Sequence, residues 1–202
     1  ECKFVTVPDN TSIIDEAELL AKAAFNRLGL ENQDFIEAKQ IVNWPARLQE
    51  LSLSSGHRLI LDAAHNPSGL KRVQQSIIEI GKKNNHSDDI SLLFGTSPQQ
   101  ELETMLQLVN EICKSFSRVR LYLTKPFGGR YPGLDPENLA KFEWSCDAIY
   151  TYPDVVTAID QILSNTMESG VIISLGSLYL QGNILNHLGK NSDDDLSLLP
   201  KQ

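Results

Sequence analysis

Residues 59–82 are LILDAAHNPSGLKRVQQSIIEIGK, and the fold class can be argued from this stretch. A short apolar run, typical of a buried strand, ends at Asp62. Pro67 then suits the first turn of a helix, and apolar spacing of helical period continues to Lys82. A strand that leads directly into a helix is the first half of a unit whose next strand runs parallel to it.

The same alternation continues downstream. Strands are predicted at 90–94, 119–123, 148–150 and 171–174, and helices at 99–115, 136–142, 154–164 and 178–188. Because strands joined by helices need crossover connections, we predict an α/β, Rossmann-like, mostly parallel sheet with helices on both faces.

The pattern differs upstream. Helices are predicted over 15–30 and 33–41, and two β-type runs at 46–53 and 57–64 flank a Ser-Ser-Gly turn typical of a hairpin. We place a domain boundary near 43–45. The prediction is a helical remnant of another domain over 1–44, the α/β domain over 45–190, and a disordered acidic tail over 191–202.

Composition excludes several classes of partner. The chain has 202 residues, 41% of them hydrophobic, which is enough for one sizeable core, and it begins at Glu1 as a piece of a longer protein would. Its net charge is −8 and its basic residues form no stripe, so nucleic acid is not an expected partner. No apolar run approaches the roughly 20 residues of a membrane helix.

The three cysteines, Cys2, Cys113 and Cys146, are far apart and lack the spacing of metal ligands. This use of cysteine favours a reducing compartment, which would be the cytoplasm or, alternatively, the mitochondrion.

The predicted strand ends carry the candidate chemistry, because ligands of open parallel sheets bind at the carboxyl ends of the strands. Asp62, His65 and Asn66 project together after one strand. An ionised carboxylate there can accept two hydrogen bonds from the hydroxyls of a ribose. The alternatives are that Asp62 or Asn66 only caps the next helix and that His65 is an ordinary capping or packing histidine.

Two further segments add candidates. Arg47 follows a proline at the predicted hinge, and its guanidinium suits phosphate or a base, although it could be an ordinary surface arginine. Ser177 follows the last strand and would cap the last helix with its hydroxyl on the same edge. Trp44 and Trp144 are interpreted as packing residues rather than stacking platforms. In the Gly/Pro-rich loop 125–133, Lys125 or Arg130 could meet an anion, but the segment is interpreted as a mobile surface loop. The sequence has neither a P-loop nor a dinucleotide GxGxxG motif.

Three motifs together carry a resemblance. WPAR at 44–47, LDAAHNP at 61–67 and GSLYL at 176–180, with strand–helix repeats between them, resemble the C-terminal domain of folylpolyglutamate and dihydrofolate synthases of the Mur ligase superfamily. The resemblance covers residues 15–188, and the first forty or so match the end of that family's central ATPase domain. It implies an ATP-dependent ligase that joins L-glutamate to a folate or dihydropteroate carboxylate through an acyl phosphate.

The resemblance also implies site roles and partners. Arg47 would contact ATP and Asp62 its ribose, while His65 would be catalytic and would lie with Ser177 near the glutamate. The missing N-terminal ATPase domain would hold the Mg²⁺ ligands, this piece alone would be inactive, and the whole would be a monomer.

The sequence departs from the family pattern at several points. Ala46 and Ala63 or Ala64 stand where glycine is common, the acidic DKD-like segment after Gly95 is replaced by TSPQQ, and the asparagine that usually opens the last central-domain helix is absent. These departures motivate a second hypothesis, a catalytically degenerate paralogue that acts as a nucleotide or protein binding module. A third, a Rossmann-like oxidoreductase, is disfavoured by the missing glycine fingerprint.

Overall fold

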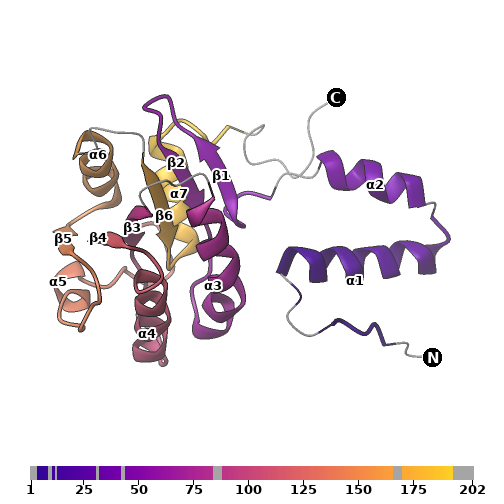
Figure 1. Cartoon of the computed structure of the whole chain (residues 1–202), viewed down its shortest axis with the longest axis horizontal. Coiled ribbons are helices and arrows are strands. Elements are labelled where there is room, and N and C mark those ends of the chain that lie inside the picture. Colours follow the sequence, from indigo (N-terminus) through magenta and orange to yellow (C-terminus); the bar gives the residue numbers. More distant parts are fainter. Residues whose placement is uncertain are drawn as a thin grey trace.

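A mixed sheet lies at the centre of the α/β domain in the computed structural model, which describes residues 4–8, 11, 13–30, 32–41, 44–83, 88–165 and 170–192. Within those residues the strand order is β1-β2-β6-β3-β4-β5 (Figure 1). Their bounds are β1 (Gln49–Ser52), β2 (Arg58–Leu61), β3 (Asp89–Phe94), β4 (Arg118–Thr124), β5 (Ala148–Tyr152) and β6 (Val171–Leu175). β1 pairs antiparallel with β2 through the predicted hairpin, and the other neighbouring strands are parallel. The predicted fold class is confirmed.

Helices cover both faces of the sheet. Their bounds are α1 (Ile13–Leu28), α2 (Asn32–Ile41), α3 (Pro67–Lys82), α4 (Leu102–Cys113), α5 (Pro136–Leu139), α6 (Val155–Asn165) and α7 (Leu178–His187). Side chains of α3, α4 and α5 pack in one apolar layer, and those of α6 and α7 pack in the other. Since β6 is buried along its whole length, its sequence is a nearly continuous apolar run rather than an alternating one.

Two predicted helices are shorter than expected. The helix predicted over 99–115 begins only at Leu102, because residues 96–99 belong to a loop held by the hydrogen bond from Leu134 N to Thr96 O, 2.8 Å. The helix predicted over 136–142 is a single turn ending at Leu139. Beyond it Trp144 packs edge-on against the ring of Phe94, with centroids 6.2 Å apart, so Trp144 is the packing residue that was predicted.

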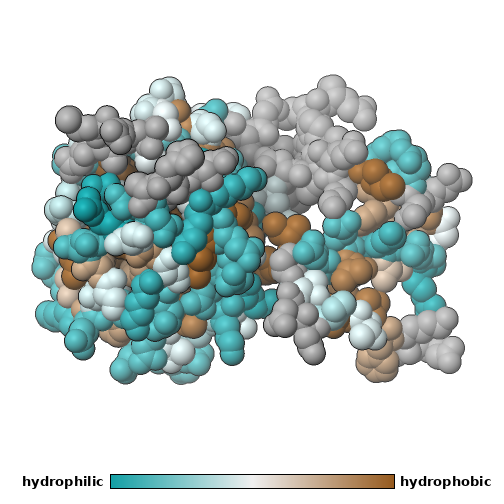
Figure 2. Space-filling view, viewed as in Figure 1, coloured by the Kyte–Doolittle hydropathy of each residue, from teal (hydrophilic) through white to brown (hydrophobic). Residues whose placement is uncertain are grey.

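Helices α1 and α2 form a separate pair beside the sheet domain (Figure 1). They meet through the rings of Phe25 and Phe35, whose centroids lie 5.3 Å apart. No residue of α1 is buried, and Figure 2 shows apolar side chains at the surface of this pair. The start of α1 touches the sheet domain, where Ile13 packs on the larger apolar layer and Glu16 pairs with Arg72 of α3. Of the predicted acidic tail, residues 193–202 lie outside the described residues.

The carboxyl ends of β2 and β6 are joined by backbone hydrogen bonds beyond the strands themselves. Asp62 N donates to Ser174 O at 3.1 Å, and Gly176 N donates to Ala64 O at 3.1 Å. Ala63 N donates to Ala46 O at 2.9 Å, which brings the segment before β1 to the same edge. The three motifs of the sequence therefore meet at one rim of the sheet.

The segment before β1 is a tight turn with left-handed backbone at two non-glycine residues, Ala46 (φ 54°) and Leu48 (φ 47°). Such a conformation costs an L-residue other than glycine about 1–2 kcal/mol. The methyl group of Ala46 is buried, since the residue is only 3% exposed. The burial of this methyl group therefore opposes the backbone strain at the same residue.

We expect Ala46→Gly to leave stability unchanged or raise it by up to about 1 kcal/mol, because relief of the left-handed backbone offsets the loss of one buried methyl group. Ala63→Gly is the matched control, because Ala63 is equally buried and has no positive φ. It should destabilise by about 1 kcal/mol or more. Urea denaturation of both variants measures the difference, and equal destabilisation would contradict the strain argument.

Candidate functional site

Two adjoining cavities lie at the rim where β2 and β6 end. The first, about 330 Å³, lies between the start of α1, residues 44–48 and the start of α3. The second, about 360 Å³, lies between the loop after β3, the loop 125–133 and the start of α7. His65 and Asn66 line both and form the wall between them. Both volumes are within the range of small-molecule sites.

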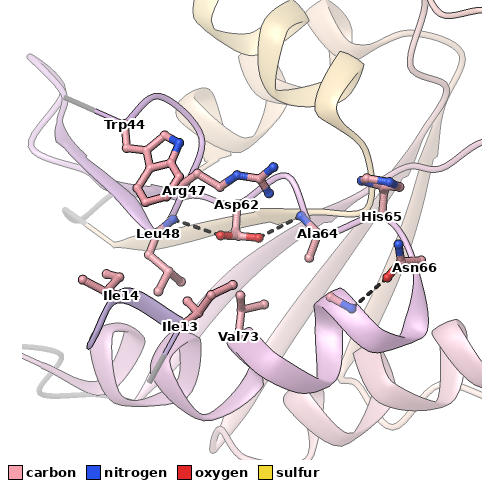
Figure 3. Close-up of a pocket in the computed structure, with 11 residues that line it drawn as sticks. Ile13, Ile14, Trp44, Arg47, Leu48, Asp62, Ala64, His65, Asn66 and Val73 are labelled. Atoms are coloured by element: carbon pink, nitrogen blue, oxygen red, sulfur yellow. Dashed lines mark hydrogen bonds between the residues drawn. The ribbon is translucent and has the colours of Figure 1, made fainter. Parts of the chain in front are cut away.

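Asp62 sits at the floor of the first cavity and is 1% exposed. Its Oδ2 accepts from Leu48 N at 2.9 Å and its Oδ1 accepts from Ala64 N at 2.8 Å (Figure 3). Gln181 of α7 also donates to the backbone oxygen of Asp62, at 3.0 Å. The carboxylate thus fixes the turn that carries Arg47 against the end of β2, so both of its oxygens already have a structural partner.

Burial raises the pKa of Asp62 above its ordinary value, because a desolvated carboxylate is less stable when charged. The amides of Leu48 and Ala64 and the positive charge of Arg47 act in the opposite direction. The capping alternative considered for Asp62 does not apply, because the acceptor at the start of α3 is Asn66, which bonds Gly69 N at 2.7 Å.

Arg47 and Trp44 form the exposed side of the first cavity. Figure 3 shows the side chain of Arg47 extending above Asp62 with its guanidinium group directed toward His65. Trp44 is 51% exposed at the cavity wall, so its interpretation as a packing residue was wrong. Opposite them, Ile13, Ile14 and Val73 supply apolar surface. A flat apolar group could lie between these walls with an anion at the guanidinium end.

His65 is exposed, and its ring orientation is fixed by one bond. Its Nδ1 lies 2.9 Å from Ala63 O, and since a carbonyl only accepts, Nδ1 carries the hydrogen. Nε2 is therefore the ring atom left for a ligand in either cavity. His65 is neither a cap nor a packing residue.

Ser177 lies in the second cavity and is 5% exposed. Its hydroxyl accepts from Tyr179 N at 3.1 Å, which confirms the predicted cap of α7. Gly176 before it has φ 111°, and an added Cβ there would stand 2.6 Å from Gly95 O. The backbone of the β6 and β3 ends is therefore too close for any side chain at residue 176.

The structure brings the four predicted site residues to the same rim, although not all into one cavity. Arg47 and Asp62 line the first cavity, Ser177 lines the second, and His65 lines both. Sequence reasoning missed the apolar wall of Ile13 and Ile14. It considered an anion contact at Arg130 but favoured a mobile surface loop, and Arg130 lines the second cavity. Nothing local to residues 13 and 14 signals their position, because they reach the rim from a distant segment.

Within the described residues, no group of three or more His, Cys, Asp or Glu side chains could hold a metal ion. Likewise, none of the described helices is both long and apolar enough to cross a membrane.

No family model matches the chain, and no curated protein matches it by sequence. Solved structures, in contrast, match the chain in fold. A bifunctional folylpolyglutamate synthase/dihydrofolate synthase of Yersinia pestis, complexed with AMPPNP and Mn, is 23% identical with a TM-score of 0.67, over 89% of this chain and 40% of that one. A structure of a bifunctional synthase of the same description, with Mn, AMPPNP and L-glutamate bound, is 20% identical with a TM-score of 0.66, over 94% and 43%. The Mycobacterium tuberculosis folylpolyglutamate synthase, complexed with ADP and AMPPCP, is 19% identical with a TM-score of 0.61, over 86% and 39%.

These likenesses show that the chain has the fold of the corresponding part of those synthases. The chain spans about 40% of the length of the first of these structures. The fold implied by the three motifs is therefore confirmed.

Proposed function

We propose that this chain is the C-terminal portion of an ATP-dependent ligase that joins L-glutamate to the carboxylate of a folate or dihydropteroate through an acyl phosphate. The observation that carries the proposal is the meeting of Arg47, Asp62, His65 and Ser177 at one rim, around two adjoining cavities. The fold is shared with synthases whose structures contain an ATP analogue, and in one case L-glutamate.

The first cavity is the proposed nucleotide site. Its apolar walls suit a purine base, and the guanidinium of Arg47 suits a phosphate or the base face. Asp62 holds the turn that orients Arg47, through its bond to Leu48 N. A ribose contact by Asp62 is part of the proposal, since each carboxylate oxygen has a second lone pair beyond the one used by the backbone amide.

The second cavity is the proposed site of the amine donor and the reacting carboxylate. Nε2 of His65 stands on the wall between the two cavities, where it can take a proton from the attacking amine or stabilise charge on the acyl phosphate. The start of α7, which Ser177 caps, adds partial positive charge in the second cavity.

ATP phosphates and Mg²⁺ are assigned to the N-terminal part of the proposed ligase, because the sequence has no P-loop. Acyl phosphate formation depends on positioning and charge neutralisation, and Mg²⁺ bound in that part would supply the charge neutralisation at the transferred phosphoryl group. The exposed apolar surface of α1 and α2 would belong to the contact with that part.

The proposal predicts that the 202-residue chain alone hydrolyses no ATP, because the phosphate cradle and metal ligands lie elsewhere. The full-length protein is expected to incorporate radiolabelled L-glutamate into dihydropteroate, a folate monoglutamate or both, in an ATP- and Mg²⁺-dependent manner. Omitting ATP is the control. ATP hydrolysis by the isolated chain, or no incorporation with any acceptor by the full-length protein, would contradict the proposal.

A further inference from the structure

The loop 125–133 is anchored on both sides of the second cavity. Phe127 N donates to Asn183 Oδ1 of α7 at 3.0 Å, and Asn183 Nδ2 donates back to Phe127 O at 3.3 Å. At its far end, Leu134 N donates to Thr96 O in the loop after β3, at 2.8 Å. The segment is the surface loop that was predicted, with Phe127 and Tyr131 more than half exposed, and these bonds tie it to α7 and to the loop after β3.

Two glycines of the loop, Gly129 and Gly133, lie so close to neighbouring groups that an added Cβ would crowd them. An added Cβ at Gly129 would stand 2.9 Å from the ring of Tyr179, and one at Gly133 would stand 2.6 Å from Pro126 O. Arg130 lies between these two glycines, is exposed, and lines the second cavity. Its guanidinium lies 5.5 Å from the centroid of the Tyr131 ring, within the range of a cation–π contact.

The charges around this cavity favour an anion. Among the described residues that line the second cavity, Arg130 carries the one permanent positive charge, and none is Asp or Glu. The cavity thus differs from the chain as a whole, which has a net charge of −8. The ion pairs found among the described residues leave Arg130 without a carboxylate partner. The start of α7, capped by Ser177, lines the same cavity, and a helix of 10 residues adds partial positive charge there.

We infer that Arg130 binds a carboxylate of the incoming amino acid in the second cavity and so selects an acidic amine donor; this inference rests on the proposed function. A guanidinium matches the two oxygens of a carboxylate in one plane, which an ammonium cannot do. With the carboxylate at Arg130, the amine of the same molecule would lie in the cavity that His65 also lines.

The test is Arg130→Gln in the full-length protein, with Arg130→Lys as the conservative variant and Arg118→Gln as the matched control. Arg118 is exposed at the start of β4, the opposite end of the sheet, where it pairs with Asp89. Calorimetry measures L-glutamate binding in the presence of AMPPNP and Mg²⁺, and AMPPNP binding separately. We expect Arg130→Gln to weaken L-glutamate binding by about 10- to 100-fold and to raise its KM similarly, as loss of a charged hydrogen-bond partner would.

AMPPNP binding should be unchanged in Arg130→Gln, Arg130→Lys should be intermediate, and Arg118→Gln should match the wild type. L-glutamate binding that is unchanged in Arg130→Gln, or undetectable in the wild type, would overturn the inference. Weaker AMPPNP binding with unchanged L-glutamate binding would assign Arg130 to a phosphate and overturn it also. If L-glutamate binds through Arg130 but is never incorporated into an acceptor, the proposed function fails while the carboxylate contact at Arg130 stands.

Discussion

Replacing Asp62 with alanine is expected to lower the free energy of unfolding of this chain by about 2–6 kcal/mol, because two buried amides would lose their acceptor, at about 1–3 kcal/mol each. Those amides are Leu48 N and Ala64 N, which join the turn before β1 to the end of β2. Without these two hydrogen bonds, the strained turn at Ala46 and Leu48 would be held less firmly against the end of β2. Urea denaturation followed by circular dichroism measures the change.

Asp154→Ala is the control for that prediction. Asp154 also accepts from a backbone amide, Thr157 N at 2.8 Å, but it lies at the surface. Losing an exposed cap of this kind costs about 1 kcal/mol. If Asp62→Ala were no more destabilising than Asp154→Ala, the structural role of the buried carboxylate would be refuted.

In the full-length protein, under conditions where the variant stays folded, Asp62→Ala should also weaken AMPPNP binding, because Arg47 loses its fixed position.

Gly176→Ala is the second change with a large expected effect, a loss of about 2–5 kcal/mol of stability from backbone strain and overpacking together. Gly176 has φ 111°, and an added Cβ would stand 2.6 Å from both Gly95 O and Phe94 Cε2. Phe94 is fully buried in the sheet, so its ring has no free direction in which to move. Thermal denaturation of the variant measures the loss.

Gly182→Ala tests whether the effect belongs to the site rather than to glycine as such. Gly182 lies within α7, with no atom within 4 Å of an added Cβ. Alanine there should stabilise the helix by about 0.5–1 kcal/mol. Equal destabilisation by both substitutions would contradict the close approach at Gly176. Since Ser177 follows Gly176 directly, a Gly176→Ala protein that remains folded should also lose part of its L-glutamate binding.

The order of elements could be predicted because its causes are local. Pro67 and Asn66 start α3 where expected, and Ser177 starts α7, since a capping side chain and its amide lie within three residues of each other. Helix ends without such a signal were less predictable. Glu101 makes no side-chain cap bond, and the beginning of α4 was placed three residues too early.

By itself the sequence determined the α/β class, the hairpin before the parallel strands, and the gathering of Asp62, His65 and Ser177 at strand ends. Those features follow from apolar periodicity, capping residues and the rule that parallel strands end at one edge. The tertiary structure alone decided that Asp62 is buried beneath Arg47 and that Arg130 and His65 line the same cavity. The physical reason is that the partners of these side chains come from distant segments, such as Leu48 for Asp62 and Asn183 for the loop of Arg130, and only the folded chain brings such segments into contact.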